Sequence, residues 1–293
     1  MDSKVLHLVR HGQAFHNVQG EILLQMRSSW KIFLDGRWRR LTLKHFLRAF
    51  RCLWLLLCCI VSPAPPRPSS SPAAVMPIYY EHADASLTAT GWEQAEFLHR
   101  EFRISGLRDR VELVVVSPLT RTLQTASGIF GGGNFTDTTD QLAAPLMVDN
   151  VGRCPRPAIS SANSPPFVAL ELCREKLGTM PCDQRSPRSK SEIQFPGIDF
   201  SNIEQDQDEL WKPDRREPEE ELDKRARAFL EWLWSRGEEE IAVVSHAGFL
   251  TNLVTKFGDE AVNKTVFANC ELRSVRLRKI VTGSDYAFEL TAA

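Results

Sequence analysis

The sequence has little of what marks secreted, metal-binding or nucleic-acid-binding proteins. Its seven cysteines are an odd number, and none of them forms the doubled C-x-x-C spacing of a zinc site. We therefore expect reduced thiols in an intracellular, cytoplasmic protein and no bound metal. The net charge of -1 gives no general attraction to polyanions, so a nucleic-acid partner is not expected.

Long apolar segments are also missing. The N-terminus, MDSKVLHLVRHG, has no apolar stretch before a cleavage site, which argues against a secretory signal. An uninterrupted apolar run, CLWLLLCCIV, covers only ten residues, 52–61, whereas a transmembrane helix needs about 20. Basic residues precede it closely, so the alternatives are an interfacial helix and a loosely packed insertion. We favour the insertion and do not expect membrane contact through residues 41–61.

Residues 21–75 differ in composition from the rest of the chain. They carry nine Lys or Arg residues against two acidic ones, and they end in a stretch rich in proline and serine. Such a stretch suits neither a packed strand nor a packed helix. We interpret residues 1–293 as a single domain interrupted by a basic, proline-rich insertion at 21–75 that is expected to be disordered. An intron retained in the gene model is the alternative explanation.

Hydrophobic periodicity predicts strands that alternate with helices. We expect strands at residues 5–10, 112–117, 166–172, 241–245, 272–280 and 286–291, and helices at 88–105, 118–130, 219–236 and from 246 onward. Thr90 and Glu93 have the spacing of a capping box, and Phe97 falls on the predicted apolar face of the first helix. The alternation predicts an α/β fold with a mainly parallel sheet.

Three of these strands carry arginine or histidine at or just after their carboxyl ends. The three segments are Arg10-His11-Gly12, Ser117 to Arg121, and His246-Ala247-Gly248. Binding sites in open α/β sheets form at this edge, guanidinium groups bind phosphate bidentately, and helix N-termini after two of the strands would add backbone N–H donors. Gly12 would let the backbone approach an anion. These residues alone support two interpretations about equally. One is a phosphate pocket with a nitrogen nucleophile, and the other is a set of ordinary structural residues.

Four segments in chain order resemble the histidine phosphatase superfamily, in particular its phosphoglycerate-mutase-like group. They are LVRHGQAFHN, DASLTATGWEQA, VVSPLTRTLQTA and VVSHAGF. The stretches ELCREKLGTMPCDQR and FPGIDFSNIEQDQDELW are similar to the plant- and fungal-type mutase-like proteins. The resemblance implies a three-layer αβα sandwich with a mainly parallel central sheet, and chemistry that needs neither metal nor cofactor.

The resemblance also implies roles for six residues. His11 matches the nucleophile that forms a phosphohistidine, and Glu175 matches the acid that protonates the leaving oxygen. The residues that match the phosphate-binding set are Arg10, Asn17, Arg121 and His246. An attacking histidine needs one neutral ring nitrogen, so the other nitrogen of His11 is expected to bond an acceptor such as a backbone carbonyl.

These roles predict a phosphatase, a phosphoric monoester hydrolase, that acts on a small phosphorylated metabolite through a phosphohistidine intermediate. The first alternative is a cofactor-dependent phosphoglycerate mutase, which would need a long basic and proline-rich clamping segment near the middle of the chain. The second is a non-catalytic phosphate-binding or regulatory protein, against which the intact set of residues argues. One departure from the family pattern is Ala247, because a second glycine is common at that position.

Overall fold

The computed structural model describes residues 3–18, 83–134, 144–263 and 266–293. The chain divides into two compact units, one of residues 1–14 and 78–293 and the other of residues 15–77. The elements below belong to the first unit. The predicted insertion at 21–75 lies outside the described residues, and the assignment of 1–293 to one domain stays a prediction.

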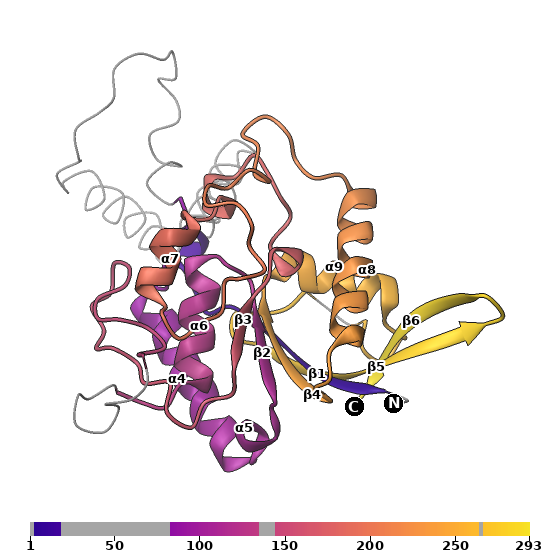
Figure 1. Ribbon diagram of the computed structural model, residues 1–293, viewed down its shortest axis with the longest axis horizontal. Helices are drawn as coiled ribbons and strands as arrows, with labels where there is room; N and C mark the ends of the chain where they lie inside the picture. The colour runs from indigo at the N-terminus through magenta and orange to yellow at the C-terminus, as the bar shows by residue number, and fades with distance from the viewer. Residues whose placement is uncertain (1–2, 19–82, 135–143, 264–265) are drawn as a thin grey trace, which may run out of the picture. The chain divides into compact units, whose positions relative to one another are not determined.

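A mixed sheet of six strands forms the centre of the first unit (Figure 1). In spatial order the strands are β3 (Phe167–Ala169), β2 (Leu113–Val116), β4 (Glu240–Ser245), β1 (Lys4–Arg10), β5 (Leu272–Thr282) and β6 (Asp285–Ala292). The first four are mutually parallel, whereas β5 pairs antiparallel with β1 and with β6. The prediction of a mainly parallel sheet is confirmed, and the carboxyl ends of β1, β2 and β4 therefore share one edge.

Helices cover both faces of this sheet (Figure 1). One layer holds α4 (Ala89–Ile104) and α6 (Thr120–Phe130), and the other holds α8 (Glu219–Ser235) and α9 (Ala247–Phe257). Alternate side chains of β2 enter the two hydrophobic clusters: Val114 and Val116 pack with α4 and α6, and Leu113 and Val115 with α8 and α9. This is the predicted three-layer αβα sandwich.

Four short helical segments complete the described part of the unit. They are α5 (Leu107–Arg110), η2 (Glu171–Cys173), η3 (Pro181–Asp183) and α7 (Arg188–Gln194). Segments η2 and η3 flank a loop at residues 174–180 that leaves the sheet after β3. Within the described ranges, no helix combines the length and apolarity required to cross a bilayer.

The start of α4 differs from the predicted capping box. Thr88 has extended backbone angles and its hydroxyl accepts the Gly91 N–H at 3.1 Å, so Thr88 is the N-cap. Thr90 already lies inside the helix and cannot cap it. Phe97 is 55% exposed and does not belong to the buried face. The predicted helix at 118–130 begins two residues later, because Pro118 lies before α6 and Leu119 is its N-cap.

Candidate active site

Three neighbouring strand ends bring the predicted residues together. The His11 N–H donates to the Ser245 carbonyl at 3.0 Å and the Ser117 N–H donates to the Val244 carbonyl at 3.1 Å, so the ladders on both sides of β4 extend one residue past the strands. This register places His11, Ser117 and His246 beside one another at the carboxyl edge of the sheet.

His11 is buried, and its ring is held in one orientation. Nδ1 lies 2.7 Å from the Gly12 carbonyl oxygen. Because a carbonyl can only accept, Nδ1 carries the hydrogen and the lone pair resides on Nε2. The His11 carbonyl accepts the Asn269 side-chain amide at 3.1 Å and the Cys270 N–H at 3.3 Å, which fixes the backbone. The expected backbone acceptor for the ring is present.

The surroundings of His11 favour its neutral form. Burial holds the pKa of this imidazole well below its ordinary value, and the positive charges of Arg121 and Arg10 lower it further. The hydrogen bond to Gly12 acts in the opposite direction and is outweighed. The ring is therefore neutral at pH 7, which is the state that a nitrogen nucleophile requires.

Arg121 brings a buried positive charge to His11. We call His11, Arg10, Arg121 and His246 the histidine–arginine cluster. Arg121 lies in the first turn of α6 and is 1% exposed. One terminal nitrogen donates to the Cys182 carbonyl and the other forms an ion pair of 3.1 Å with Asp183. These bonds use two of the five guanidinium N–H donors, and Nε has no partner among the described residues. Arg121 is thus anchored by η3 and keeps donors for an anion.

His246 completes the pair of histidines. It is fully buried at the N-cap of α9, and its ring centroid lies 5.2 Å from that of His11 in an edge-to-face arrangement. Its Nε2 is 2.8 Å from the hydroxyl of Ser117. Ser117 is not among the site residues predicted from the sequence, although its position directly after a strand is a usable signal. Among the described residues, no group of three or more potential ligands is placed to hold a metal ion.

The Glu175 carboxylate lies against the start of α9. It accepts the N–H groups of Phe249 at 3.1 Å, Gly248 at 3.2 Å and Lys176 at 2.9 Å. These N–H donors, two of them in the first turn of α9, fix the position of the Glu175 side chain. Glu175 is therefore held immediately beside His246, so five of the six predicted residues belong to this edge of the first unit.

Asn17 is the sixth predicted residue, and it belongs to the second unit. Its side-chain amide lies 3.1 Å from Nε2 of its neighbour His16. The role of Asn17 in holding the transferred group stays a prediction.

Some of the backbone donors expected to serve the phosphate bind carboxylates of the protein. Asp84 accepts the N–H of Thr120, the first residue of α6, at 2.7 Å. Glu175 accepts the N–H groups of Gly248 and Phe249, the second and third residues of α9. Carboxylates therefore occupy these three N–H groups. For the other N–H groups of the two first turns, the expectation that they cradle the anion stays a prediction. The guanidinium groups add positive charge to the site.

Gly12 is required for a different reason from the one expected. A Cβ atom at this position would lie 2.6 Å from the Gly91 carbonyl oxygen in the first turn of α4. Its N–H donates to the Thr125 hydroxyl at 3.0 Å. The glycine therefore allows the end of β1 to pack directly on the backbone of α4, and its N–H is not directed to an anion.

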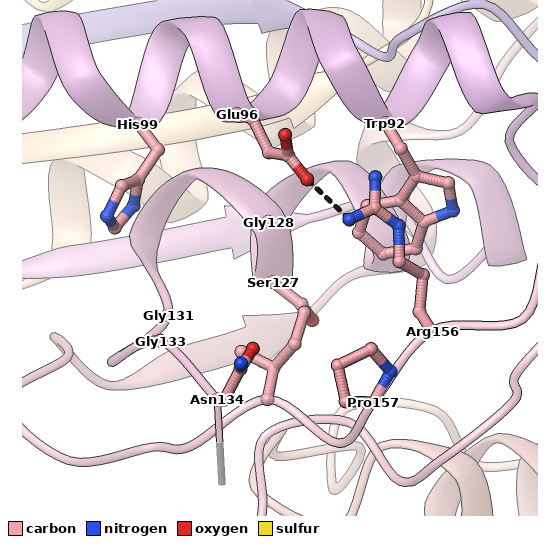
Figure 2. Close-up of a pocket in the computed structure, with 11 residues that line it drawn as sticks. Trp92, Glu96, His99, Ser127, Gly128, Gly131, Gly133, Asn134, Arg156 and Pro157 are labelled. Carbon is pink, nitrogen blue, oxygen red and sulfur yellow. Dashed lines mark hydrogen bonds and ion pairs between the residues drawn. The ribbon is translucent and has the colours of Figure 1, made fainter.

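A separate pocket of about 150 Å³ lies beside α4 and α6 (Figure 2). Figure 2 shows Glu96 and Arg156 paired at its rim, with the Arg156 guanidinium stacked on Trp92. These two opposite charges neutralise each other, and the third titratable side chain, His99, bonds the Ile129 carbonyl. The pocket shares no residue with the histidine–arginine cluster and offers no net charge to a phosphate.

Gly248 gives a first prediction for the candidate site. A Cβ atom there would lie 2.2 Å from Oε1 of Glu175, so the carboxylate would have to move. With Glu175 as the acid that the family resemblance implies, we expect Gly248→Ala to slow phosphoryl transfer from an alkyl phosphate by about 10- to 100-fold, since acid–base assistance depends on hydrogen-bonding geometry. The matched control is Gly237→Ala, where the added methyl group meets nothing within 4 Å. Equal rates for the two variants would contradict this placement of Glu175.

The chain belongs to the histidine phosphatase superfamily (branch 1), whose family model matches residues 71–142 and 191–281. Phosphoglycerate mutase-like protein 1 of Arabidopsis thaliana is 40% identical, with 96% of this chain and 84% of that protein covered. A second Arabidopsis phosphoglycerate mutase-like protein is 41% identical over 93% and 83% of the two chains. Among solved structures, the ecdysone phosphate phosphatase from Bombix mori is 16% identical with a TM-score of 0.42, covering 97% and 91%. A likeness at that level carries no information about substrate.

Proposed function

We propose that the protein is a phosphatase that hydrolyses a small phosphorylated metabolite through a phosphohistidine on His11. One observation carries the proposal. The buried, neutral ring of His11 is tied through Nδ1 to the Gly12 carbonyl and is subject to the positive charges of Arg10 and Arg121. That arrangement supplies a nucleophilic nitrogen and charge neutralisation at one point, which is what phosphoryl transfer requires.

In the first step, Nε2 of His11 attacks phosphorus in line with the ester oxygen. An N–P bond forms, the P–O bond to the leaving group breaks, and its electron pair stays on the leaving oxygen. Glu175 in its protonated form gives that oxygen a proton, and the alcohol departs. The arginines offset the negative charge on the non-bridging phosphate oxygens as it redistributes in the transition state.

In the second step, water attacks the phosphohistidine. Glu175, now ionised, takes a proton from the water while an O–P bond forms and the N–P bond breaks. The electron pair of that bond returns to Nε2, and inorganic phosphate leaves. Acid–base assistance of this kind is worth ~10²–10⁴-fold.

The names of the Arabidopsis relatives favour a second candidate, a phosphoglycerate mutase. A mutase shares the first step and differs in the second, because the phosphoryl group returns to another oxygen of the substrate instead of passing to water. The two candidates are therefore separated by the fate of the phosphoryl group.

Product analysis of the wild-type protein separates the candidates. Sugar, nucleotide, inositol and phosphoglycerate esters are incubated with it, and both inorganic phosphate and isomerised phosphoglycerate are measured. We expect release of inorganic phosphate from at least one ester class, with water as the acceptor. Interconversion of 3- and 2-phosphoglycerate without phosphate release would replace the phosphatase by the mutase. If neither product forms, a non-catalytic phosphate-binding protein is favoured.

The proposed setting is cytoplasmic, with a small phosphorylated substrate and no nucleic-acid partner. Four cysteines within the described ranges are free, which supports it, since oxidising secretory compartments favour disulfides. They are Cys154, Cys173, Cys182 and Cys270. Residues 41–61, for which membrane contact is not expected, lie outside the described residues.

A further inference from the structure

We propose that Arg225 and Glu217 are positioning residues for Glu175, the acid of the proposed reaction. The inference rests on the proposed function and deepens it. Arg225 lies on α8 with its side chain 10% exposed, and Glu217 lies just before that helix with its side chain 5% exposed. Neither touches the histidine–arginine cluster through an interaction seen among the described residues.

All five N–H donors of Arg225 are bonded, two to Glu217 and three to the segment that carries Glu175. Nε and one terminal nitrogen bind the two oxygens of Glu217 at 2.8 and 2.7 Å. The remaining donors reach the main-chain carbonyls of Leu172 and Arg174, both at 2.9 Å, and of Glu175 at 3.2 Å. A rigid guanidinium fork satisfied in this way fixes the direction of the chain entering and leaving Glu175.

Glu217 holds the other side of the same loop. Its Oε2 accepts the Leu177 N–H at 3.0 Å, and its own N–H donates to the Leu177 carbonyl at 2.9 Å. Burial acts to raise the pKa of Glu217, but the hydrogen bonds and charge of Arg225 outweigh it and hold the pKa below its ordinary value. The carboxylate therefore stays ionised and paired at neutral pH.

The pair also reaches the place where the Glu175 side chain binds. The Arg225 guanidinium lies 5.1 Å from the centre of the Phe249 ring, within the range of a cation–π interaction. The N–H of Phe249 is one of the donors to the Glu175 carboxylate. Arg225 thus contacts both the backbone of the acid and the helix turn that holds its oxygens.

Two esters with different leaving groups distinguish a role of Arg225 and Glu217 in positioning Glu175 from a role in stabilising the fold. Nitrophenolate is a stable anion that departs without a proton, whereas phenolate gains more from protonation by an acid. A misplaced Glu175 slows the second kind of ester selectively. General loss of folded protein lowers both rates by the same factor.

The test compares kcat/KM for phenyl phosphate and p-nitrophenyl phosphate in Arg225→Met and the wild type. We expect a loss of about 10- to 100-fold for phenyl phosphate and of less than about threefold for p-nitrophenyl phosphate. Glu175→Gln should show the same selectivity, and Glu175→Gln with Arg225→Met should lose no more than Glu175→Gln alone, because both act through one group.

A second variant guards against misfolding. Arg225→Met leaves the Glu217 carboxylate buried without its partner, a costly state, whereas Arg225→Met with Glu217→Gln removes both charges. Arg227→Met is the matched control on the same helix, since Arg227 forms an exposed pair with Glu231. We expect the charge-free double variant to keep the selective loss and Arg227→Met to keep wild-type rates for both esters.

Equal losses for the two esters, no loss for either, or additive losses in combination with Glu175→Gln would each overturn the inference. The proposed function fails separately, if the wild type releases no phosphate or His11→Ala retains the wild-type rate. A selective loss in Glu175→Gln that is absent from the Arg225 variants would refute the positioning role alone.

Discussion

Replacing His11 by alanine is expected to lower kcat for phosphate release by at least about 10³-fold, the scale on which loss of a covalent nucleophile acts. The imidazole is the neutral nitrogen base at the centre of the site, and its pKa is held low by burial and by two arginines. Alanine offers no atom to receive the phosphoryl group, and the arginines alone can only bind it. The measurement is release of inorganic phosphate from the best ester of the substrate panel.

The control for this variant is His99→Ala. His99 lies on α4, lines the separate pocket of Figure 2 and bonds the Ile129 carbonyl at 2.8 Å. Losing that bond is expected to cost about 0.5–1.5 kcal/mol of stability and to leave the rate within about twofold. Phosphate release by His11→Ala at the wild-type rate would remove His11 from the nucleophile role.

Replacing Arg121 by methionine is expected to lower kcat/KM by about 10²–10³-fold, the scale for loss of one preorganised charge at a transition state. Methionine fills a similar volume without the charge, and Asp183 keeps a second partner, Arg216, at 2.9 Å. The fold should therefore survive with a loss of about 1–3 kcal/mol from the broken buried bonds. Steady-state kinetics and urea unfolding measure the two effects.

Arg216→Met is the control for Arg121→Met, because it removes the other partner of the same carboxylate. Arg216 is 37% exposed and pairs with Asp183, so its replacement should reduce stability while kcat/KM stays within about threefold. A loss of activity in Arg216→Met that matched the loss in Arg121→Met would mean that Arg121 acts through the η3 loop and not on the phosphate.

Local patterns were enough to predict the sheet and the three strand ends. Strands β1, β2 and β4 are short runs of apolar, mostly β-branched residues, and their parallel pairing follows from the helices between them. That pairing brings His11, Ser117 and His246 to one edge. The alignment of these ends needs no long-range information beyond chain order. The residues alone therefore made a site there one of two equally supported readings, and the family resemblance favoured it.

Features that depend on distant partners could not be predicted in the same way. Thr88 caps α4 because its backbone N–H donates to the Gln13 carbonyl at 3.0 Å, a contact with residues far earlier in the chain. Asp84 binds one backbone donor at the start of α6, and Glu175 binds two in the first turn of α9. In each case the hydrogen-bond partner comes from a residue distant in the chain and not from the neighbouring sequence.

The Arg225–Glu217 pair illustrates the same limit for charged residues. In a helix such as α8, an arginine four positions after a cluster of glutamates predicts a solvated surface. Burial of this pair depends on the carbonyls of residues 172, 174 and 175, some 50 positions earlier. Helical periodicity identifies the apolar face of α8, but it does not predict that the segment at residues 172–175 contacts Arg225 of this helix.

Trapping the covalent intermediate tests the central claim most directly. The wild-type protein is mixed with a substrate ester carrying ³²P, quenched in alkali during turnover and digested for mass spectrometry. The account predicts an acid-labile, alkali-stable phosphoryl group on His11 that forms and decays at rates compatible with kcat, and no label in His11→Ala. Phosphate release without label on the protein, or with the label on another residue such as His246, would contradict it.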